Sequence, residues 1–129
     1  MKVGIVGYGV VGKTRFHSIV KNTPYKVIAI SENNSIARKD IPKNIDVFED
    51  YQSLIEQSNV DIVFISLPNK FAANATVLSL KKGLHVFCEK PPARTLAELQ
   101  EVLLVSQQHS GLKLMYGFNH RFHHSVEEA

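Results

Sequence analysis

The sequence has little of several features that would point to particular classes of protein. It contains a single cysteine, Cys88, among 129 residues, which excludes a disulfide framework and a cysteine-rich zinc site. No apolar run approaches the roughly 18 residues that a membrane-spanning helix requires. The apolar start of the chain is interrupted by glycines and is not followed by a small-residue cleavage site, so it predicts a strand and turn rather than a signal peptide. We therefore expect a cytoplasmic protein without a membrane partner.

Dense positive charge is also missing. The formal net charge is +3, and the lysines and arginines are scattered, without a basic run and interleaved aromatic residues. Such a run is what a nucleic-acid-binding surface usually shows. The sequence therefore predicts no nucleic-acid partner.

Three histidines near the end of the chain raise the question of a metal site. His120, His123 and His124 have the i, i+3, i+4 spacing that would bring them together on a helix. No motif supplies a carboxylate or cysteine partner, and Arg121 lies among them. We expect no metal site here.

What the sequence does contain is a regular alternation of short β-rich apolar runs with longer helical segments. The expected strands are 2–8, 26–31, 45–48, 60–68, 84–90 and 112–119. The expected helices are 10–22, 49–59, 70–83 and 95–111, with one short helical turn within 33–44. This alternation is typical of βαβ units. It predicts an α/β protein with a three-layer Rossmann fold, in which helices cover both faces of a doubly wound, mostly parallel sheet.

The domain organisation follows from where this alternation stops. Residues 1–119 are expected to form one nucleotide-binding domain. Residues 120–129 differ in character, and we expect them to begin the connection to a second domain outside this sequence.

A glycine-rich turn, "GYGVVG", follows the first strand and opens the first helix. In this G-x-G-x-x-G arrangement Gly7 allows a tight turn, Gly9 lets the backbone approach a pyrophosphate, and Gly12 allows close helix–strand packing. The N-terminus of the helix offers free N–H groups to the phosphates. The predicted cofactor-binding residues of this turn are Gly7, Tyr8, Gly9, Val10, Val11 and Gly12.

The end of the second strand carries an acid, Glu32. A carboxylate there would hydrogen-bond the ribose hydroxyls of the cofactor and repel a 2′-phosphate, which favours NAD over NADP. Arg38 and Lys39 follow closely enough to weaken that preference. Two alternatives stay open at this point. Glu32 could be a solvated loop residue, and an S-adenosylmethionine-dependent methyltransferase would use a similar turn and acid.

Three further segments should meet at the carboxyl edge of the sheet, where open α/β sheets bind ligands: 66–69, 88–91 and 118–121. A lysine at this edge, Lys90, could hydrogen-bond a substrate hydroxyl or carbonyl and exchange a proton with it. The alternative is a surface lysine paired with Glu89. Between these two readings the position alone does not decide.

Four segments in order, "GIVGYGVVG", "DIVFISLPN", "GLHVFCEKPPARTLAE" and "GFNHRF", resemble the glucose–fructose oxidoreductase/inositol dehydrogenase (Gfo/Idh/MocA) family. The resemblance covers essentially the whole chain, and the "EKP" after the fifth strand is its most specific part. It implies a two-domain NAD(P)-dependent oxidoreductase that acts on sugars, sugar nucleotides or cyclitols.

The resemblance also implies roles for particular residues. Lys90 would contact both cofactor and substrate and assist proton transfer, Glu89 would lie by the nicotinamide ribose, and Pro91 would follow a cis peptide bond. The residues implied for the adenosine side are Ser66, Leu67, Pro68 and Asn69, and those for the nicotinamide end are Asn119 and Arg121. The sequence departs from the family at Ala72, where members often carry a histidine. His85 and Cys88 are expected to be a hydrogen-bonded core residue and a small buried apolar residue.

The second domain implied by the family would supply most of the substrate pocket and the contacts for a homo-oligomer. We therefore expect the 129 residues to bind the cofactor without turning over substrate. The alternative is a non-catalytic NAD(P)-sensing or interaction module, which would need the glycine turn but not Lys90.

Overall fold

In the computed structural model, residues 1–119 and Ser125 are described. The strands within this part are β1 (Lys2–Val6), β2 (Lys26–Ser31), β3 (Asp46–Phe48), β4 (Ile62–Ile65), β5 (His85–Cys88) and β6 (Leu114–Tyr116). The helices are α1 (Val10–Asn22), α2 (Ser35–Arg38), α3 (Tyr51–Gln57), α4 (Asn69–Lys81) and α5 (Leu96–Gln108). Residues 120–124 and 126–129, with Arg121 and the three terminal histidines, lie outside the described residues.

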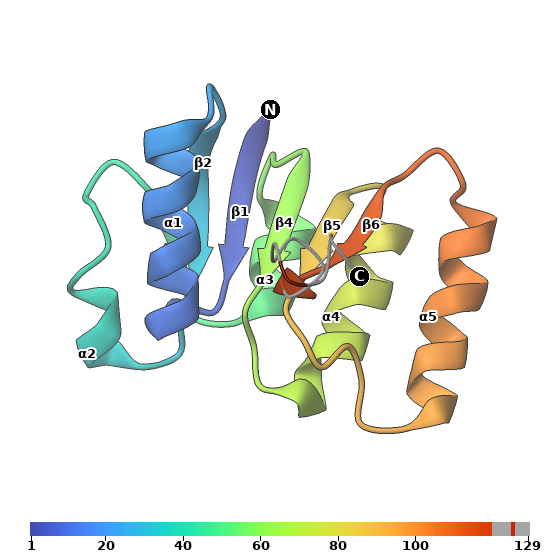
Figure 1. Cartoon of the computed structure of the whole chain (residues 1–129). Coiled ribbons are helices and arrows are strands. Elements are labelled where there is room, and N and C mark those ends of the chain that lie inside the picture. Colours follow the sequence, from blue (N-terminus) through green and yellow to red (C-terminus); the bar gives the residue numbers. More distant parts are fainter. Residues whose placement is uncertain (120–124, 126–129) are drawn as a thin grey trace.

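The strands form one sheet in the order β3-β2-β1-β4-β5-β6, and every described pair is parallel. Val6 at the end of β1 is in register with Ser31 of β2 and with Ile65 of β4. The arrowheads of β1, β2 and β4 accordingly reach the same edge of the sheet in Figure 1. The strand order reverses direction between β1 and β4, which is the topological switch point of a doubly wound sheet. The predicted Rossmann fold is confirmed.

Helices cover both faces of the sheet, and each face has its own apolar core. On one face Ile19 of α1 packs with Val3, Ile5 and Ile30 of the sheet. On the other face α3, α4 and α5 contribute buried side chains that include Leu54, Leu80 and Val102. Figure 1 shows α1 in front of the sheet and α4 behind it. These strands are apolar on both sides because both sides are covered, as is usual in parallel sheets.

Several strands are shorter than predicted because the chain leaves the sheet sooner. β1 ends at Val6, since Gly7 has a φ of +90° and turns the backbone toward α1. β4 ends at Ile65, and the apolar residues that follow it line the cavity described below. Apolar character alone could not separate a strand from an apolar loop that follows it.

The predicted helix 10–22 is confirmed as α1, whereas α3 and α5 are shorter than the predicted 49–59 and 95–111. The side chain of Thr95 caps α5 by accepting a hydrogen bond from the Glu98 N–H (3.2 Å). Gly83 follows α4 with a φ of +87°, a conformation that favours glycine after a helix. The short turn expected within 33–44 is α2, which begins after Asn34.

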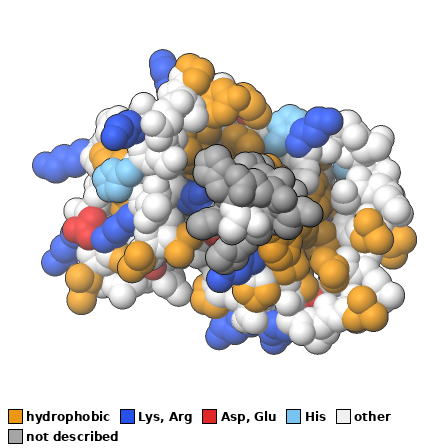
Figure 2. Space-filling model, in the orientation of Figure 1, with side chains coloured by type: hydrophobic (Ala, Val, Ile, Leu, Met, Phe, Trp, Pro, Cys, Tyr) orange, Lys and Arg blue, Asp and Glu red, His pale blue; other side chains and the backbone are white. Residues whose placement is uncertain are grey.

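The surface of the described part carries no dense basic run. Lysine and arginine side chains appear at separate places on the face shown in Figure 2. Helix α5 exposes Leu96, Leu103 and Leu104 alongside polar residues that include Gln100 and Glu101. Among the described residues no helix is long and apolar enough to cross a membrane, and no group of three histidine, cysteine or acidic side chains could hold a metal ion.

Candidate functional site

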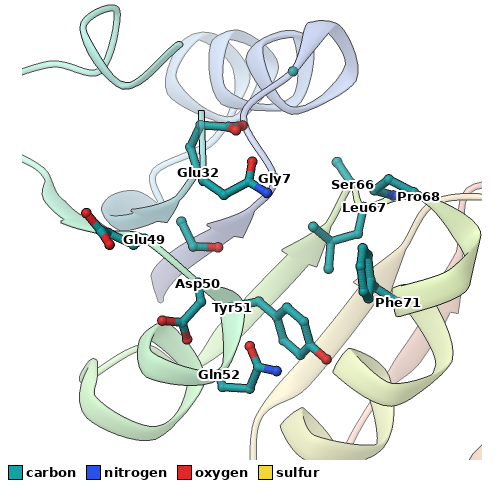
Figure 3. A pocket seen from close by; sticks show the side chains of 13 residues that line it. Gly7, Glu32, Glu49, Asp50, Tyr51, Gln52, Ser66, Leu67, Pro68 and Phe71 are labelled. Carbon is teal, nitrogen blue, oxygen red and sulfur yellow. The ribbon is translucent and has the colours of Figure 1, made fainter. Parts of the chain in front are cut away.

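An open cavity of about 470 Å³ lies at the carboxyl ends of β1, β2 and β4. Figure 3 shows it bounded by the glycine turn, the end of β2, the start of α3 and the loop that follows β4. Its lining residues are Gly7, Gly9, Ser31, Glu32, Asn33, Glu49, Asp50, Tyr51, Gln52, Ser66, Leu67, Pro68 and Phe71. The cavity therefore lies beside the topological switch point, where sheets of this kind bind ligands.

The three glycines of the turn are required for different reasons. A Cβ at Gly7 would lie 2.6 Å from the Ser66 carbonyl oxygen, and one at Gly12 would lie 2.0 Å from the Gly7 carbonyl oxygen. Nothing in the protein lies within 4 Å of a Cβ at Gly9. Gly7 and Gly12 thus serve the packing of the turn, whereas the space at Gly9 is open.

Gly9 is also the N-cap of α1, and it has no side chain to bond the first N–H groups of the helix. The first turn of α1 carries no acidic residue. The positive end of the helix is consequently left without a negative partner from its own first turn. This is the arrangement that receives a phosphate at the N-terminus of a helix.

The remaining residues of the turn lie around the cavity without lining it. The side chain of Tyr8 is only 2% exposed and packs in the core on the α1 side, against Phe16. Val10 and Val11 are exposed, and Gly12 is buried beneath the turn. Any contact of Tyr8 with a cofactor would have to come from its backbone.

Glu32 is fixed at the rim of the cavity by two backbone hydrogen bonds. The Tyr8 N–H donates to Oε2 of Glu32 (2.8 Å), and the Asn34 N–H donates to Oε1 (2.9 Å). The carboxylate is thereby tied both to the glycine turn and to the end of β2. It is not a freely solvated loop residue.

Arg38, one of the two basic residues that could weaken the preference for NAD, forms an ion pair. Arg38 Nη1 lies 2.8 Å from Oε1 of Glu49, a second carboxylate that lines the cavity. Lys39 is exposed and does not line it. The side of the cavity formed by β2 and the segment after β3 is therefore predominantly acidic.

An aromatic wall, formed by Tyr51 and Phe71, was not predicted as part of the site. Their ring centroids are 6.3 Å apart, and both rings flank the cavity beside Leu67 (Figure 3). The Asn74 side chain donates a hydrogen bond to the Tyr51 hydroxyl (3.2 Å). Tyr51 shares a helical face with core residues, so its spacing indicated packing only. The sequence feature that could have placed Tyr51 at the site was its position at the start of the helix that follows the third strand.

The loop after β4 is divided between the cavity and the core. Ser66, Leu67 and Pro68, three of the residues that the resemblance implies for the adenosine side, line the cavity, whereas Asn69 begins α4 and does not line it. Ala72, which stands where the family often has histidine, is 2% exposed and packs in the core. That departure changes core packing next to the loop rather than the cavity lining.

Glu89 and Lys90 lie at the end of β5, outside the cavity. Glu89 is bonded to Arg15 of α1, and Lys90 is exposed. The peptide bond between Lys90 and Pro91 is cis, as the resemblance implied. The alternative considered from the sequence, a pairing of Lys90 with Glu89, is not observed among the described residues, where the carboxylate bonds to Arg15.

The end of β6 lies next to this segment. The Gly117 N–H donates to the Cys88 carbonyl (2.9 Å), and the Asn119 N–H donates to the Gly117 carbonyl (3.0 Å). The sheet therefore brings Asn119 to the same edge as Lys90, on the far side of the switch point from Glu32. Arg121, predicted for the same end, lies outside the described residues.

Residues 1–118 match a family model described as "Oxidoreductase family, NAD-binding Rossmann fold" (GFO_IDH_MocA). The chain belongs to this family. Its membership favours an oxidoreductase over a methyltransferase as the explanation of the glycine turn and Glu32.

Relatives of the Gfo/Idh/MocA chain include dehydrogenases. This chain is 32% identical over 122 residues to the uncharacterized oxidoreductase YrbE of Bacillus subtilis, and the match covers 92% of this chain and 36% of that protein. It is 29% identical over 126 residues to D-glucoside 3-dehydrogenase of Escherichia coli, covering 95% and 36%. A scyllo-inositol dehydrogenase from Lactobacillus casei, solved with bound NAD(H) and scyllo-inositol, shares 30% identity with a TM-score of 0.89, over 99% and 39% of the two chains. The chain thus spans little more than a third of these proteins.

Two residues near the "EKP" segment of this family member have structural roles. His85 Nδ1 accepts a hydrogen bond from the Lys113 N–H (3.0 Å) at the start of β6. Cys88 is fully buried, and burial raises the pKa of its thiol to about 11. Cys88 is the small buried residue that the sequence indicated, whereas His85 is hydrogen-bonded as predicted but only half-buried, outside the apolar core.

We predict that Cys88 is inert in the folded protein. A thiol with a pKa of about 11 is almost entirely protonated at pH 8, and the thiolate is the reactive form. Labelling with a thiol-reactive disulfide reagent at pH 8 should be at least about tenfold slower for the native chain than for the chain unfolded in denaturant. Equal rates for the two states would show that the side chain is accessible.

Proposed function

We propose that the chain is the cofactor-binding part of a NAD-dependent oxidoreductase. The whole protein would transfer a hydride between nicotinamide and a hydroxyl-bearing carbon of a sugar, sugar nucleotide or cyclitol. One observation carries the proposal: the uncapped N-terminus of α1 at Gly9 opens onto a cavity that ends at a fixed carboxylate, Glu32. The family membership and the NAD(H) bound to the Lactobacillus casei relative support it.

The two halves of the cofactor would lie on opposite sides of the switch point. The adenine would rest against Leu67, Tyr51 and Phe71, with the ribose hydroxyls at Glu32 and the pyrophosphate at Gly9. Aromatic and aliphatic side chains with a few fixed polar groups are what such pockets usually provide. The nicotinamide half would then extend toward the end of β5, where Glu89, Lys90 and Asn119 lie.

The proposed preference for NAD rests on charge. A 2′-phosphate at the ribose would face Glu32 and Glu49, and Arg38 is paired with Glu49. Like charges at short range are unfavourable, and more so in a partly closed cavity. The same carboxylate at Glu32 would accept the hydroxyls of an unphosphorylated ribose.

Replacing Glu32 with glutamine tests this preference. We expect Glu32→Gln to weaken NAD binding about tenfold and to leave NADP binding unchanged or tighter, because the substitution removes a charge-assisted acceptor and a repulsion together. Calorimetric titration of both nucleotides measures the ratio. Glu56→Gln, an exposed position on α3 outside the cavity, is the matched control and should change neither affinity. Tighter binding of NADP than NAD by the unsubstituted chain would contradict the assignment.

The proposed chemistry divides between cofactor and protein. Bound nicotinamide would supply the hydride acceptor, and the protein would supply position and electrostatics. Lys90 would contact the substrate hydroxyl and share in removing its proton. The remaining substrate contacts, and a homo-oligomer interface, would belong to the part of the relatives that this chain does not span.

An activity assay tests the proposal at the level of the whole protein. Incubation of the full-length protein with NAD and a panel of cyclitols, sugars and sugar nucleotides should give NADH absorbance with at least one member. The 129-residue chain alone should bind NAD without turnover. Substrate oxidation by the chain alone would refute the division of roles proposed here.

A reducing, cytoplasmic location is supported by the lone, buried Cys88.

A further inference from the structure

Helix α1 carries an arginine that reaches across the sheet edge to the "EKP" segment. Arg15 lies three residues after Gly12, and both its Nε and its Nη2 are 2.5 Å from Oε1 of Glu89. The two residues are 74 positions apart in the sequence. The contact therefore joins the helix that begins at the glycine turn to the residue immediately before Lys90.

This ion pair is more buried than the others in the described part of the chain. The side chains of Arg15 and Glu89 are 24% and 14% exposed, whereas every other ion pair there has one partner more than half exposed. Exposed pairs contribute little, but removing one partner of a buried pair leaves an uncompensated charge. Glu89 thus depends on Arg15 more than a surface acid depends on its partner.

The surroundings of the pair restrict Glu89 further. The Arg15 guanidinium lies 4.9 Å from the ring centroid of Phe87, which stacks on Phe64 at 5.1 Å. On another side, a Cβ at Gly117 would lie 2.7 Å from Oε2 of Glu89, so the glycine leaves room for the carboxylate. The Glu89 carboxylate therefore lies between the Arg15 guanidinium, which packs on the Phe87 ring, and the backbone at Gly117.

We propose that Arg15 is a positioning residue that sets Glu89, and with it Lys90, relative to the cofactor-binding turn. The inference rests on the proposed function. The cofactor's pyrophosphate would bind at the start of α1, and Arg15 lies one turn further along the same helix. The nicotinamide half would approach Glu89, while the adenosine half would contact only the cavity on the other side of the switch point.

This division between the two halves of the cofactor gives a selective test. ADP carries the adenosine and the pyrophosphate but lacks the nicotinamide and its ribose. Titrating the chain with NAD and with ADP therefore separates the contribution of the nicotinamide half from the rest. For Arg15→Ala we expect NAD affinity to fall about tenfold, with ADP affinity changing less than about twofold.

Three further variants sharpen the test. Arg15→Lys keeps the charge but not the paired N–H groups, and should recover part of the lost NAD affinity. Glu89→Gln should show the same selective loss, and combining it with Arg15→Ala should add little, because both substitutions break one interaction. Arg94→Ala, which breaks the more exposed Arg94–Glu98 pair, is the matched control and should change neither affinity.

The outcomes separate this inference from the function on which it rests. Equal losses for NAD and ADP in Arg15→Ala and Glu89→Gln would indicate a purely structural role and overturn the inference. Unchanged affinities for both ligands would also overturn it. If the unsubstituted chain bound neither ligand, the proposed function itself would fail, and the inference with it.

Discussion

Replacing Gly12 with alanine should destabilise the fold and abolish NAD binding, whereas replacing Gly9 with alanine should impair binding alone. A Cβ at Gly12 would lie 2.0 Å from the Gly7 carbonyl oxygen, a distance that forces α1 away from the turn. Backbone lies on both sides of this contact, so it cannot be relieved by a side-chain rotation. We expect Gly12→Ala to lower the free energy of unfolding by about 3 kcal/mol or more, in the range of severe single substitutions.

Gly9 provides the matched comparison within the same turn. Nothing in the protein lies within 4 Å of a Cβ there, so Gly9→Ala should change the free energy of unfolding by less than about 1 kcal/mol. Its methyl group would stand where the pyrophosphate approaches the backbone, and NAD affinity should fall at least about tenfold. Denaturant unfolding and calorimetric titration of both variants measure the two effects. Normal NAD binding by Gly9→Ala would show that the phosphates lie elsewhere.

Replacing Lys90 with alanine in the full-length protein should reduce kcat by about 10²–10⁴-fold, the usual contribution of a positioned acid–base group. Lys90 is exposed in the described part of the chain, so the substitution should leave stability unchanged. NAD affinity should change little, because the adenosine side of the site lies beyond the switch point. Turnover is measured by NADH absorbance and binding by titration. Lys113→Ala, an exposed lysine at the amino end of β6, is the matched control.

The same substitution distinguishes the two classes of function considered for this chain. A non-catalytic sensing or interaction module needs the glycine turn and has no use for Lys90. Unchanged function in Lys90→Ala would favour that module, whereas lost turnover with retained NAD binding would favour the enzyme.

The fold could be predicted because its determinants are local. Each buried strand is a short apolar run, and each helix between strands has apolar residues at helical spacing, so the alternation alone indicated a parallel sheet. The ends of β1 and β4 were placed too late because apolar residues also line the loops after them. The turn at Gly7 and the cap at Thr95 were recognisable, since glycine and threonine have local reasons to be there.

The site was only partly predictable because some of its contacts join distant parts of the chain. The glycine turn and Glu32 belong to a motif with fixed spacing, and both line the cavity. Tyr51 and Phe71 come together from two different helices, and no spacing in the sequence relates them. Arg15 and Glu89 are a similar case, since their contact exists only once α1 packs against the end of β5.

The central claim is that this chain binds NAD at the turn that begins α1. Calorimetric titration of the purified chain with NAD, NADP and S-adenosylmethionine tests it most directly. We expect one site for NAD, weaker binding of NADP and no binding of S-adenosylmethionine. Absence of NAD binding by the folded chain, or tight binding of S-adenosylmethionine in its place, would contradict it.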